Sequence, residues 1–482
     1  MKISALFDGL SEKDGEREIS GLCNDSRSAQ NGDVFFCISG ESDDGHAHAL
    51  AAYEKGCRVF VCEKELILPD DALKIKTDCV RRTMAEAASK FYGDPCRSLF
   101  KIALTGTKGK TSTAFMIKKI LESSGRKVGV IGTLGIVYGN ENIKCVNTTP
   151  ESILIHKYCR LMADSGIDTV IFEVSSQSLK QYRTHGITFD VGIFTNLSPD
   201  HIGQGEHADY EEYRECKKKL FYSCSVGFFN CDDAEYGYMT DGVPCDIHTF
   251  GMRDGAEYKA ENAAFPLKNG VMTSEYVVDG TFVSTDYPGR PGLYDSLCAF
   301  AVCDHLKTER YIIADSLRDI RINGRCETFP LPNGSSVIID YAHNRLSVSE
   351  LFTTVLPYVK GRIFTVFGCG GERSKERRTG MGDVISQYSD VAVITCDNPR
   401  SEKLRSISRD IKKGIRKGSR CRFRAIYDRK KAIWYCMKKA SGNDVILVIG
   451  KGHEDHMEIG KQKYRYSDRE TVISLADRLR DN

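Results

Sequence analysis

The segment Lys101-Ile-Ala-Leu-Thr-Gly-Thr-Lys-Gly-Lys-Thr-Ser-Thr113 decides the fold expected for this 482-residue chain. Its apolar run, residues 102–104, predicts a buried strand, and a helix is expected to begin near Lys110. Gly106 and Gly109 lie between the strand and the helix, where they let the backbone approach a phosphate without Cβ clashes. Backbone N–H groups and the positive end of the helix then form an anion site.

The spacing within this segment is typical of a nucleotide phosphate loop in the short form G-x-x-G-K-T. Leu104 stands where the commoner G-x-x-x-x-G-K-[ST] loop has its first glycine. Lys110 is expected to reach the terminal phosphates, and the Thr111 hydroxyl to hold Mg²⁺. The alternative is a glycine turn followed by an exposed lysine. This alternative is disfavoured because the expected strand, the two glycines, the Lys-Thr pair and the expected helix are all features of a phosphate loop.

Composition indicates an ordinary soluble globular protein. Hydrophobic residues make up 41% of the chain and charged residues 28%, and the formal net charge is +2. No global field therefore favours nucleic acid or a membrane surface. No uninterrupted apolar run approaches the roughly 18 residues that a membrane span needs. The N-terminus lacks a long apolar signal core, so we expect a cytoplasmic location.

The 19 cysteines are scattered, with no C-x-x-C pair and no regular spacing. We therefore expect reduced, mostly buried thiols rather than a disulfide framework. Without paired ligands, a zinc site is not expected.

The chain length favours about three domains. We predict an α/β protein with a small mixed α/β domain (residues 1–97), a central parallel-sheet ATPase domain of the P-loop type (98–322) and a Rossmann-like doubly wound domain (323–482). A helix is expected at residues 48–55. Strands are expected at residues 33–38, 58–62, 127–131, 169–174, 190–195, 336–340, 362–367, 390–395 and 444–449.

Ligands of open α/β sheets bind beyond the carboxyl ends of the strands. Polar side chains gather at such positions here: Glu173 and residues 196–201, 340–343, 368–373, 397–400 and 450–454. Ordinary loops also carry Gly, Asn and Asp. So many functional groups at strand ends nevertheless favour a cleft between two domains.

Three features have a functional and a structural interpretation. Glu173 can complete Mg²⁺ coordination opposite the phosphate loop, or form a salt bridge at a strand end. His201 can bind a metal ion or orient phosphate, but a histidine in a loop is more often a surface residue. Lys217-Lys-Lys219 lies among mixed charges at helical spacing, and periodicity alone predicts a solvated helix face.

Residues 403–431 are strongly basic. Ile407, Ile411 and Ile415 recur at every fourth position, which predicts an amphipathic helix packed on a sheet with a wet basic face. Nucleic-acid binding is disfavoured because no aromatic platform or known module accompanies the charges.

Taken in order, the motifs of this chain resemble those of the Mur ligases, in particular the enzymes that add the third peptide residue to UDP-N-acetylmuramoyl-dipeptide. The resemblance covers nearly the whole chain. It rests on Asn24-Asp-Ser-Arg27, Asn31-Gly-Asp-Val-Phe-Phe36, Asp44-Gly-His46, Gly106-Thr-Lys-Gly-Lys-Thr111, Asn147-Thr-Thr-Pro150, Glu173-Val-Ser-Ser176, Asn196-Leu-Ser-Pro-Asp-His201, Gly324-Arg325, Asp340-Tyr-Ala-His343, Phe367-Gly-Cys-Gly-Gly-Glu-Arg373, Asp397-Asn-Pro-Arg400 and Gly450-Lys-Gly-His-Glu-Asp455.

The resemblance implies ATP-dependent amide formation through an acyl phosphate, with ATP and Mg²⁺ as cofactors. It implies Lys110, Glu173, His201, Lys217 and Arg325 as catalytic residues. Lys217 matches a lysine that the family carries as a carbamate, which would make it an oxygen ligand for Mg²⁺ beside Thr111, Glu173 and His201. The implied ATP contacts are Gly106, Thr107, Lys108, Gly109, Lys110, Thr111, Ser112, Asp295, Arg325, Asp340 and His343.

The resemblance also implies the other two substrates. Asp397-Asn-Pro-Arg400 is associated in this family with meso-diaminopimelate rather than lysine, and Arg400 can grip the distal carboxylate that lysine lacks. Glu454 would answer the distal ammonium. The implied amino-acid contacts are Arg373, Asp397, Asn398, Arg400, Gly450 and Glu454. The implied contacts to the UDP-N-acetylmuramoyl-dipeptide are Ser26, Arg27, Thr148, Thr149, Ser175, Gln181 and Arg183.

The chain departs from the family pattern at several positions. After His343 the family usually continues Thr-Pro-Asp, whereas this chain has Asn344-Arg-Leu346. Asp295 stands where Asn is usual. Gln177 replaces a frequent His, and Thr379 follows Arg378 where Pro is usual.

Three alternatives remain at this point: the same reaction with lysine or another amino acid, a folylpolyglutamate-type ligase, and a nucleotide-binding regulatory protein without turnover. We expect small-molecule substrates only, with no nucleic-acid partner and no membrane insertion, and a monomer.

Overall fold

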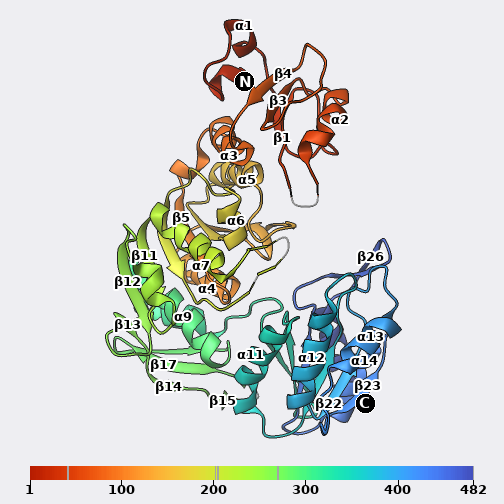
Figure 1. The fold of residues 1–482 in the computed structure, drawn as a ribbon. Helices are drawn as coiled ribbons and strands as arrows, with labels where there is room; N and C mark the ends of the chain where they lie inside the picture. The colour runs from red at the N-terminus through yellow and green to blue at the C-terminus, as the bar shows by residue number, and fades with distance from the viewer. Residues whose placement is uncertain (41–42, 201, 204–205, 269–270, 481–482) are drawn as a thin grey trace. The chain divides into compact units, whose positions relative to one another are not determined.

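The computed structural model describes residues 1–40, 43–200, 202–203, 206–268 and 271–480. The chain forms two compact units, one of residues 1–259 and 301–309, and one of residues 260–300 and 310–482. Each contains a large, mostly parallel sheet (Figure 1). The domain boundaries expected near residues 97 and 322 stay a prediction. Every helix in the described part of the chain is too short or too polar to cross a bilayer.

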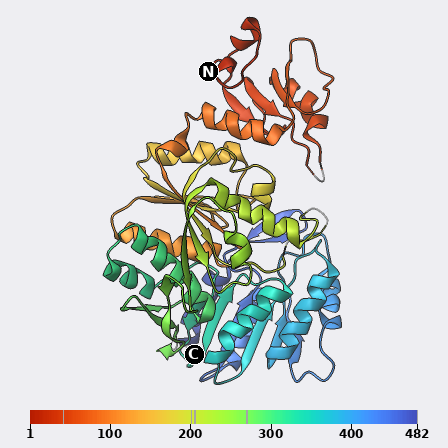
Figure 2. The ribbon, with the colours of Figure 1, turned by 60° about the vertical axis from the view of Figure 1, so that its left-hand side comes forward.

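The first unit begins with a four-stranded parallel sheet in the order β1-β2-β3-β4. Val34 and Phe36 pack on one face with α3, while Phe35 and Phe60 pack on the other face with α2. Figure 2 shows α3, in orange, beside this sheet. The elements are α1 (Glu12–Gly15), β1 (Gly21–Cys23), β2 (Asp33–Phe36), α2 (Ala49–Glu54), β3 (Val59–Cys62), β4 (Leu73–Lys76) and α3 (Val80–Phe91).

A nine-stranded sheet follows, in the order β13-β12-β11-β10-β5-β9-β6-β7-β8. Strands β13 to β6 of that order run parallel, and the β6-β7-β8 edge is antiparallel. Its strands are β5 (Phe100–Thr105), β6 (Val128–Gly132), β7 (Gly135–Tyr138), β8 (Glu141–Ile143), β9 (Thr169–Glu173), β10 (Phe189–Phe194), β11 (Cys224–Asn230), β12 (Asp246–Gly251) and β13 (Tyr258–Lys259). The helices between them are α4 (Lys110–Ser123), α5 (Ser152–Asp164), α6 (Ser176–Lys180), α7 (Tyr210–Lys218) and α8 (Tyr236–Thr240).

The second unit contains a six-stranded sheet in the order β19-β20-β24-β21-β22-β23, parallel except for the β19 edge. Ile338 packs on one face with residues of α11 to α13, and Val337 and Ile339 pack on the other with α14 and α15. The elements are β19 (Glu327–Pro330), β20 (Ser336–Asp340), α11 (Arg345–Val355), β21 (Ile363–Phe367), α12 (Lys375–Tyr388), β22 (Val391–Ile394), α13 (Leu404–Lys413), β23 (Arg422–Ala425), α14 (Arg429–Lys439), β24 (Val445–Ile449) and α15 (Asp468–Arg480).

Smaller antiparallel elements complete the second unit. A three-stranded sheet, β14-β17-β18, and two hairpins, β15-β16 and β25-β26, accompany α9 and α10. Their bounds are β14 (Glu261–Ala264), β15 (Leu267–Lys268), β16 (Val271–Met272), β17 (Ser274–Val278), β18 (Thr281–Thr285), α9 (Gly289–His305), α10 (Arg310–Arg318), β25 (His456–Ile459) and β26 (Gln462–Arg465).

The nine predicted strands all form, with bounds that differ from those expected by at most two residues. The antiparallel sheet of the second unit, β14-β17-β18, was not predicted from the sequence. The 19 cysteines are all free thiols and 15 of them are buried, as expected.

The helix expected over Ile407, Ile411 and Ile415 is shorter than predicted. Ile407 and Ile411 are buried in α13, but the helix ends at Lys413. Gly414 follows, and a Cβ there would lie 1.9 Å from the carbonyl oxygen of Thr379 in α12. Ile415 therefore belongs to the turn after the helix, where close backbone contact requires a glycine beside it.

Helix α11 begins with a capping box. The Asn344 side chain accepts a hydrogen bond from the Ser347 amide at 2.8 Å, and the Ser347 hydroxyl accepts one from the Asn344 amide at 3.2 Å. Asn344 stands at the position where the family pattern has Thr, and both residues are good N-caps. The departure in sequence therefore keeps the same helix start.

We predict that Asn344→Ala lowers the free energy of unfolding of the second unit by about 1 kcal/mol, because the Ser347 amide at the start of α11 loses its side-chain acceptor. Urea denaturation followed by circular dichroism measures the change. The matched control, Asn344→Thr, keeps a capping oxygen and should stay close to the native value. An alanine variant as stable as the native protein would contradict this role.

Candidate active site

The phosphate loop of the first unit joins β5 to α4. Gly106 and Gly109 have φ of 147° and 83°, values that favour glycine, and Gly109 is the residue that caps α4. A Cβ on Gly106 would lie 2.0 Å from the Thr195 hydroxyl oxygen. Thr111 and Ser112 are buried in the first turn of α4. The loop therefore has the conformation that the sequence predicts for an anion site.

The segment after β10 holds this loop in place. The Thr107 amide donates to the carbonyl oxygen of Asn196 at 2.9 Å, and the Lys108 amide donates to the Asn196 side chain at 2.9 Å. The Thr195 hydroxyl donates to the Lys108 carbonyl oxygen at 2.7 Å. Strands β5 and β10 are parallel neighbours, so their carboxyl ends meet at this point. His201, expected as a metal ligand a few residues on, lies outside the described residues.

Two lysines meet at the phosphate loop. The Lys110 ammonium donates to the carbonyl oxygen of Gly106 at 2.6 Å, and the Lys217 amine, from α7, donates to the same oxygen at 2.9 Å. Burial and then the positive charge of Lys110 hold the pKa of Lys217 well below its usual value. Lys217 is therefore placed to be an uncharged amine.

The prediction from periodicity that Lys217 and its neighbours form a solvated helix face is wrong for two of the three. Lys217 is 2% exposed and Lys218 is 6% exposed. The face of α7 that carries Lys217 is covered by the loop around Gly106. Charge spacing along a helix could not reveal that covering, because the loop is over a hundred residues away in the sequence.

Glu173 ends β9, the other neighbour of β5. Its buried carboxylate accepts hydrogen bonds from the Thr111 hydroxyl at 2.8 Å and from the amide and hydroxyl of Thr133 at 2.9 and 2.8 Å. A Cβ on Gly132 would lie 2.2 Å from Glu173 Oε1, so this carboxylate needs the glycine next to it. Thr133 was not predicted; its only sequence signal is its place directly after β6.

These oxygens fit a Mg²⁺ ion. Thr111 and Glu173 bring a hydroxyl and a carboxylate within 2.8 Å of each other beside the phosphate loop, and Mg²⁺ prefers such hard oxygen donors. Lys217 as an amine offers nitrogen, which suits Mg²⁺ poorly. As a carbamate it would offer oxygen instead.

The residues expected at the UDP-substrate site form a second group in this unit. Thr149 donates to the Glu173 carbonyl oxygen at 2.8 Å and accepts from the Ser175 amide at 3.1 Å. Arg183 donates to the Thr149 carbonyl oxygen at 2.7 Å and to Gln181 at 2.7 Å. Burial lowers the pKa of Arg183, and the carboxylate of Glu151, 3.0 Å away, opposes that shift.

A cavity of about 310 Å³ opens beside this group. Its lining combines residues of the four-stranded sheet region with the segment after α6, and includes Ser39, Gly40, Arg81, Lys180 and Gln181. Thr148 is 3.3 Å from the Thr133 hydroxyl, on the Glu173 side. Ser26 and Arg27 follow β1, where the exposed Arg27 pairs with Asp25 at 2.7 Å. The structure thus gathers five of the seven expected residues.

In the second unit, the expected ATP contacts come from several elements: Asp340 ends β20, His343 follows it, Arg325 precedes β19 and Asp295 lies in α9. The Asp340 carboxylate accepts from the amides of Cys326 at 2.9 Å and Ala342 at 2.7 Å. The Arg325 guanidinium lies 5.3 Å from the centre of the Tyr341 ring, and His343 contacts the same ring. Asp295 is 5% exposed, in α9.

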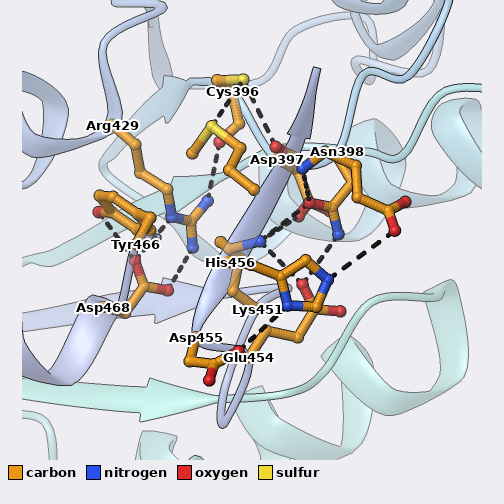
Figure 3. Close-up of polar contacts among 12 residues, drawn as sticks. Cys396, Asp397, Asn398, Arg429, Lys451, Glu454, Asp455, His456, Tyr466 and Asp468 are labelled. Atoms are coloured by element: carbon orange, nitrogen blue, oxygen red, sulfur yellow. Dashed lines mark hydrogen bonds and ion pairs between the residues drawn. The ribbon is translucent and has the colours of Figure 1, made fainter. Parts of the chain in front are cut away.

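The expected amino-acid contacts gather at the carboxyl ends of β22 and β24 (Figure 3). Asn398 donates to Glu454 at 2.8 Å. Arg400, in the left-handed region at φ 48°, donates to the Gly371 carbonyl oxygen at 2.9 Å and pairs with Glu458 at 3.0 Å. Gly450 has φ of 107°.

The remaining two contacts differ in exposure, since Asp397 is buried and Arg373 is exposed. Sequence reasoning missed Lys451, which lies between Asp397 and Glu454. Its signal was present inside the Gly450-Lys-Gly-His-Glu-Asp455 motif.

Three family models match this chain: the Mur ligase catalytic domain over residues 18–92, the Mur ligase middle domain over 104–303 and the Mur ligase glutamate ligase domain over 324–452. The chain is also 35% identical over 469 residues to a Clostridium botulinum protein named UDP-N-acetylmuramoyl-L-alanyl-D-glutamate--2,6-diaminopimelate ligase, across 96% of each chain. The chain belongs to the Mur ligase family. A Clostridioides difficile Mur ligase with the same name is 36% identical over 493 residues, which cover 99% of this chain and 100% of that protein.

Solved structures of Mur ligases share the fold. One of a UDP-N-acetylmuramoyl-L-alanyl-D-glutamate--2,6-diaminopimelate ligase has a TM-score of 0.70 at 25% identity and covers 100% of this chain and 99% of its own. The MurF ligase from Thermotoga maritima, solved with ADP, has a TM-score of 0.60 at 16% identity, over 96% and 98% of the two chains. The predictions of the family, of its three-domain α/β fold and of an ATP-dependent ligase are confirmed.

We predict that Gly132→Ala weakens Mg²⁺-ATP binding by about 10- to 100-fold, because the new methyl group displaces the Glu173 carboxylate from Thr111 and Thr133. Isothermal titration calorimetry measures the affinity. Gly129→Ala on the same strand is the matched control, since its Cβ would meet only the flexible end of Met162 at 2.6 Å. Equal affinities in the two variants would contradict the role given to Glu173.

Proposed function

We propose that this Mur ligase joins meso-2,6-diaminopimelate to UDP-N-acetylmuramoyl-L-alanyl-D-glutamate, with ATP hydrolysed to ADP and phosphate. The observation that carries the proposal is the set of side chains at the ends of β22 and β24, where Arg400 and Glu454 can answer the distal carboxylate and the distal ammonium of one acceptor. The names of the full-length relatives support the same reaction.

Mg²⁺-ATP would supply the phosphoryl group that activates the substrate carboxylate as an acyl phosphate. The amine of diaminopimelate would then attack the acyl carbon to form the amide, and inorganic phosphate would leave. The chain's own residues bind and orient. The N–H groups at the start of α4 and the Lys110 ammonium receive phosphate charge, and Thr111 and Glu173 hold the metal. Much of the rate then comes from positioning and charge neutralisation. In the second unit, Arg325, Asp340, His343 and Asp295 are proposed to bind ATP.

The substrate nucleotide is proposed to use the cavity of about 310 Å³ in the first unit. Lys180 and Arg81 bring positive charge to its lining, which suits a diphosphate. Thr148, Thr149, Ser175, Gln181 and Arg183 bind the muramoyl-peptide part beside it, and Ser26 and Arg27 bind the uridine end.

Arg400 favours diaminopimelate over lysine. Its Nε and Nη1 atoms are held by Glu458 and Gly371, while Nη2 has no partner among the described residues. Nε and Nη1 fix the guanidinium in place, and Nη2 can donate to a carboxylate of the acceptor. Diaminopimelate has such a distal carboxylate, and lysine lacks it. Lysine remains the alternative acceptor.

The intact set of Lys110, Glu173 and Lys217 disfavours a regulatory protein without turnover. A cytoplasmic location and a monomeric state stay predictions.

We predict phosphate release that requires the UDP-linked dipeptide and an acceptor together, and that is faster with meso-diaminopimelate than with lysine or ornithine. Arg400→Met should lower kcat/KM for diaminopimelate by about 10- to 100-fold, because a hydrogen-bonded charge pair is lost, and should leave lysine use unchanged. Arg405→Met, which removes an exposed arginine of α13, is the control. Equal use of lysine and diaminopimelate by the native enzyme would refute the assignment.

We also predict that Lys217 reacts with CO₂, R–NH₂ + CO₂ → R–NH–COO⁻ + H⁺. Burial and then the positive charge of Lys110 hold the pKa of Lys217 well below its usual value, which increases the share of uncharged amine that can react with CO₂. Acidification protonates the amine and should reduce the carbamate. Enzyme depleted of CO₂ should lose activity and recover it with bicarbonate, and ¹³C NMR with labelled bicarbonate should show one carbamate carbon.

The control for this experiment is Lys218→Ala, which removes the buried neighbour of Lys217 and should keep the carbamate signal. Lys217→Ala should lose it. Full activity after complete CO₂ depletion would show that the amine itself suffices.

A further inference from the structure

Lys451 is a buried cation in the middle of the proposed amino-acid site (Figure 3). Its side chain is 0% exposed, and it follows β24 by two residues. The ammonium lies 2.8 Å from Glu454 Oε2, 3.1 Å from Asn398 Oδ1 and 3.6 Å from Asp397 Oδ1. All three partners are expected amino-acid contacts, yet no role has so far been given to Lys451.

The contacts of Lys451 form a closed triangle. Asn398 donates through Nδ2 to Glu454 Oε2 at 2.8 Å, and its Oδ1 accepts from Lys451 and from the Glu458 amide at 3.0 Å. The amide orientation of Asn398 is therefore fixed, because each end has its proper partner. Both donors of the triangle meet Glu454 at the same oxygen.

Glu454 therefore uses one carboxylate oxygen, Oε2, in the hydrogen bonds of this triangle, while the other, Oε1, takes no part in it. Oε2 accepts from Lys451 and Asn398, while Oε1 has no hydrogen bond to any residue of the described chain. The Glu454 side chain keeps 21% exposure, so it is reachable from solvent. This geometry presents Oε1 to an incoming ammonium group without the need to reorganise the site.

The charges of the cluster support the same conclusion. Asp397 and Glu454 bring two negative charges and Lys451 brings one positive charge, which leaves one negative charge for one ammonium of the acceptor. Without Lys451, two carboxylates would share a poorly hydrated pocket and repel each other.

A second buried cation, Arg429, fixes the backbone that carries Asp397 and the segment after β24. Arg429 and Asp468 form an ion pair at 2.7 Å with both side chains 0% exposed. Arg429 also donates to the carbonyl oxygens of Cys396 at 3.3 Å and Ile449 at 2.9 Å. These carbonyls immediately precede Asp397 and Gly450. Arg429 thus fixes the backbone at the carboxyl ends of β22 and β24. Lys451 in turn orients the side chains of Asn398 and Glu454.

We propose that Lys451 is a positioning residue for the acceptor amino acid: it holds Glu454 and Asn398 in the orientation that binds an ammonium group of diaminopimelate. The inference rests on the proposed function and adds to it a residue that acts through Glu454 rather than by touching the substrate.

The test compares steady-state kinetics of the native enzyme and Lys451→Met. The KM for diaminopimelate should rise by about 10- to 100-fold, because the partly exposed carboxylate of Glu454 loses a charged hydrogen-bond donor, while the KM values for ATP and the UDP-linked dipeptide stay unchanged. The matched control is Arg362→Met, which breaks the 2.7 Å pair with Asp444 just before β24 begins, at the opposite end of that strand. It should leave all three KM values unchanged.

A double-mutant cycle separates positioning from general loss of structure. In a Glu454→Gln background, Lys451→Met should raise the KM for diaminopimelate little further, since its effect passes through Glu454. A full additional rise in that background would overturn the inference, as would an unchanged KM in the single variant. If Lys451→Met does not fold, Lys451→Gln, which keeps a donor and removes the charge, is measured in its place.

Whether the native enzyme uses diaminopimelate distinguishes a failure of the proposed function from a failure of the role given to Lys451. A native enzyme that does not use diaminopimelate overturns the proposed function and this inference together. A native enzyme that uses it, with a Lys451→Met variant of the same KM, overturns the inference alone.

Discussion

The carbonyl oxygen of Gly106 accepts hydrogen bonds from two lysine side chains, and the chemistry of the first unit depends on that arrangement. Two ammonium groups so close, one of them fully buried, cannot both keep their charge at low cost. Burial of Lys217, and then the positive charge of Lys110, lower the pKa of Lys217 well below its usual value. A lysine whose pKa is lowered is deprotonated more readily, and only the deprotonated amine can form a carbamate. The proposed carbamate at Lys217 depends on this shift.

The two units use the same geometric principle for different ligands. In each, many of the side chains with a proposed role lie at or just after the carboxyl ends of parallel strands that are neighbours in the sheet: β10, β5 and β9 in the first unit, and β20, β24, β21 and β22 in the second. Glycines at these ends let one segment approach another, as Gly132 does for Glu173. Charged side chains are then fixed by short, well-defined contacts, so that the site is formed before a ligand arrives.

Buried ionic groups have unequal roles in this protein. Arg429 forms an ion pair with Asp468 and donates to the backbone carbonyl oxygens of Cys396 and Ile449, which is a structural function. Lys451 is as deeply buried, but its partners include a carboxylate with an oxygen to spare. The difference between a structural and a positioning cation therefore lies in the partner's remaining hydrogen-bonding capacity and not in burial itself.

Much of the fold and part of the site could be predicted because their signals are local. The apolar runs predicted β5, β6, β9 and β10 of the nine-stranded sheet and β20, β21, β22 and β24 of the six-stranded sheet, and the glycines and the Lys-Thr pair predicted the phosphate loop. Periodicity was wrong for Lys217 and Lys218, and it extended α13 to Ile415, because neither the Gly106 loop over α7 nor the Thr379 carbonyl beside Gly414 is visible in a window of neighbouring residues. Thr133 and Lys451 were missed since nothing in the sequence says which side chain a carboxylate will accept from.

By itself, then, the sequence determined the principal strands of the large sheets, the phosphate loop and, through its motifs, the Mur ligase resemblance, since each depends on residue type and spacing along the chain. Only the tertiary structure decided that Lys217 and Lys110 share one carbonyl oxygen, that Thr133 completes the partners of Glu173 and that Lys451 lies between Asn398 and Glu454. Such contacts join segments that are distant in sequence. The charge of a buried group depends on those neighbours and on exclusion of water, which no stretch of sequence contains.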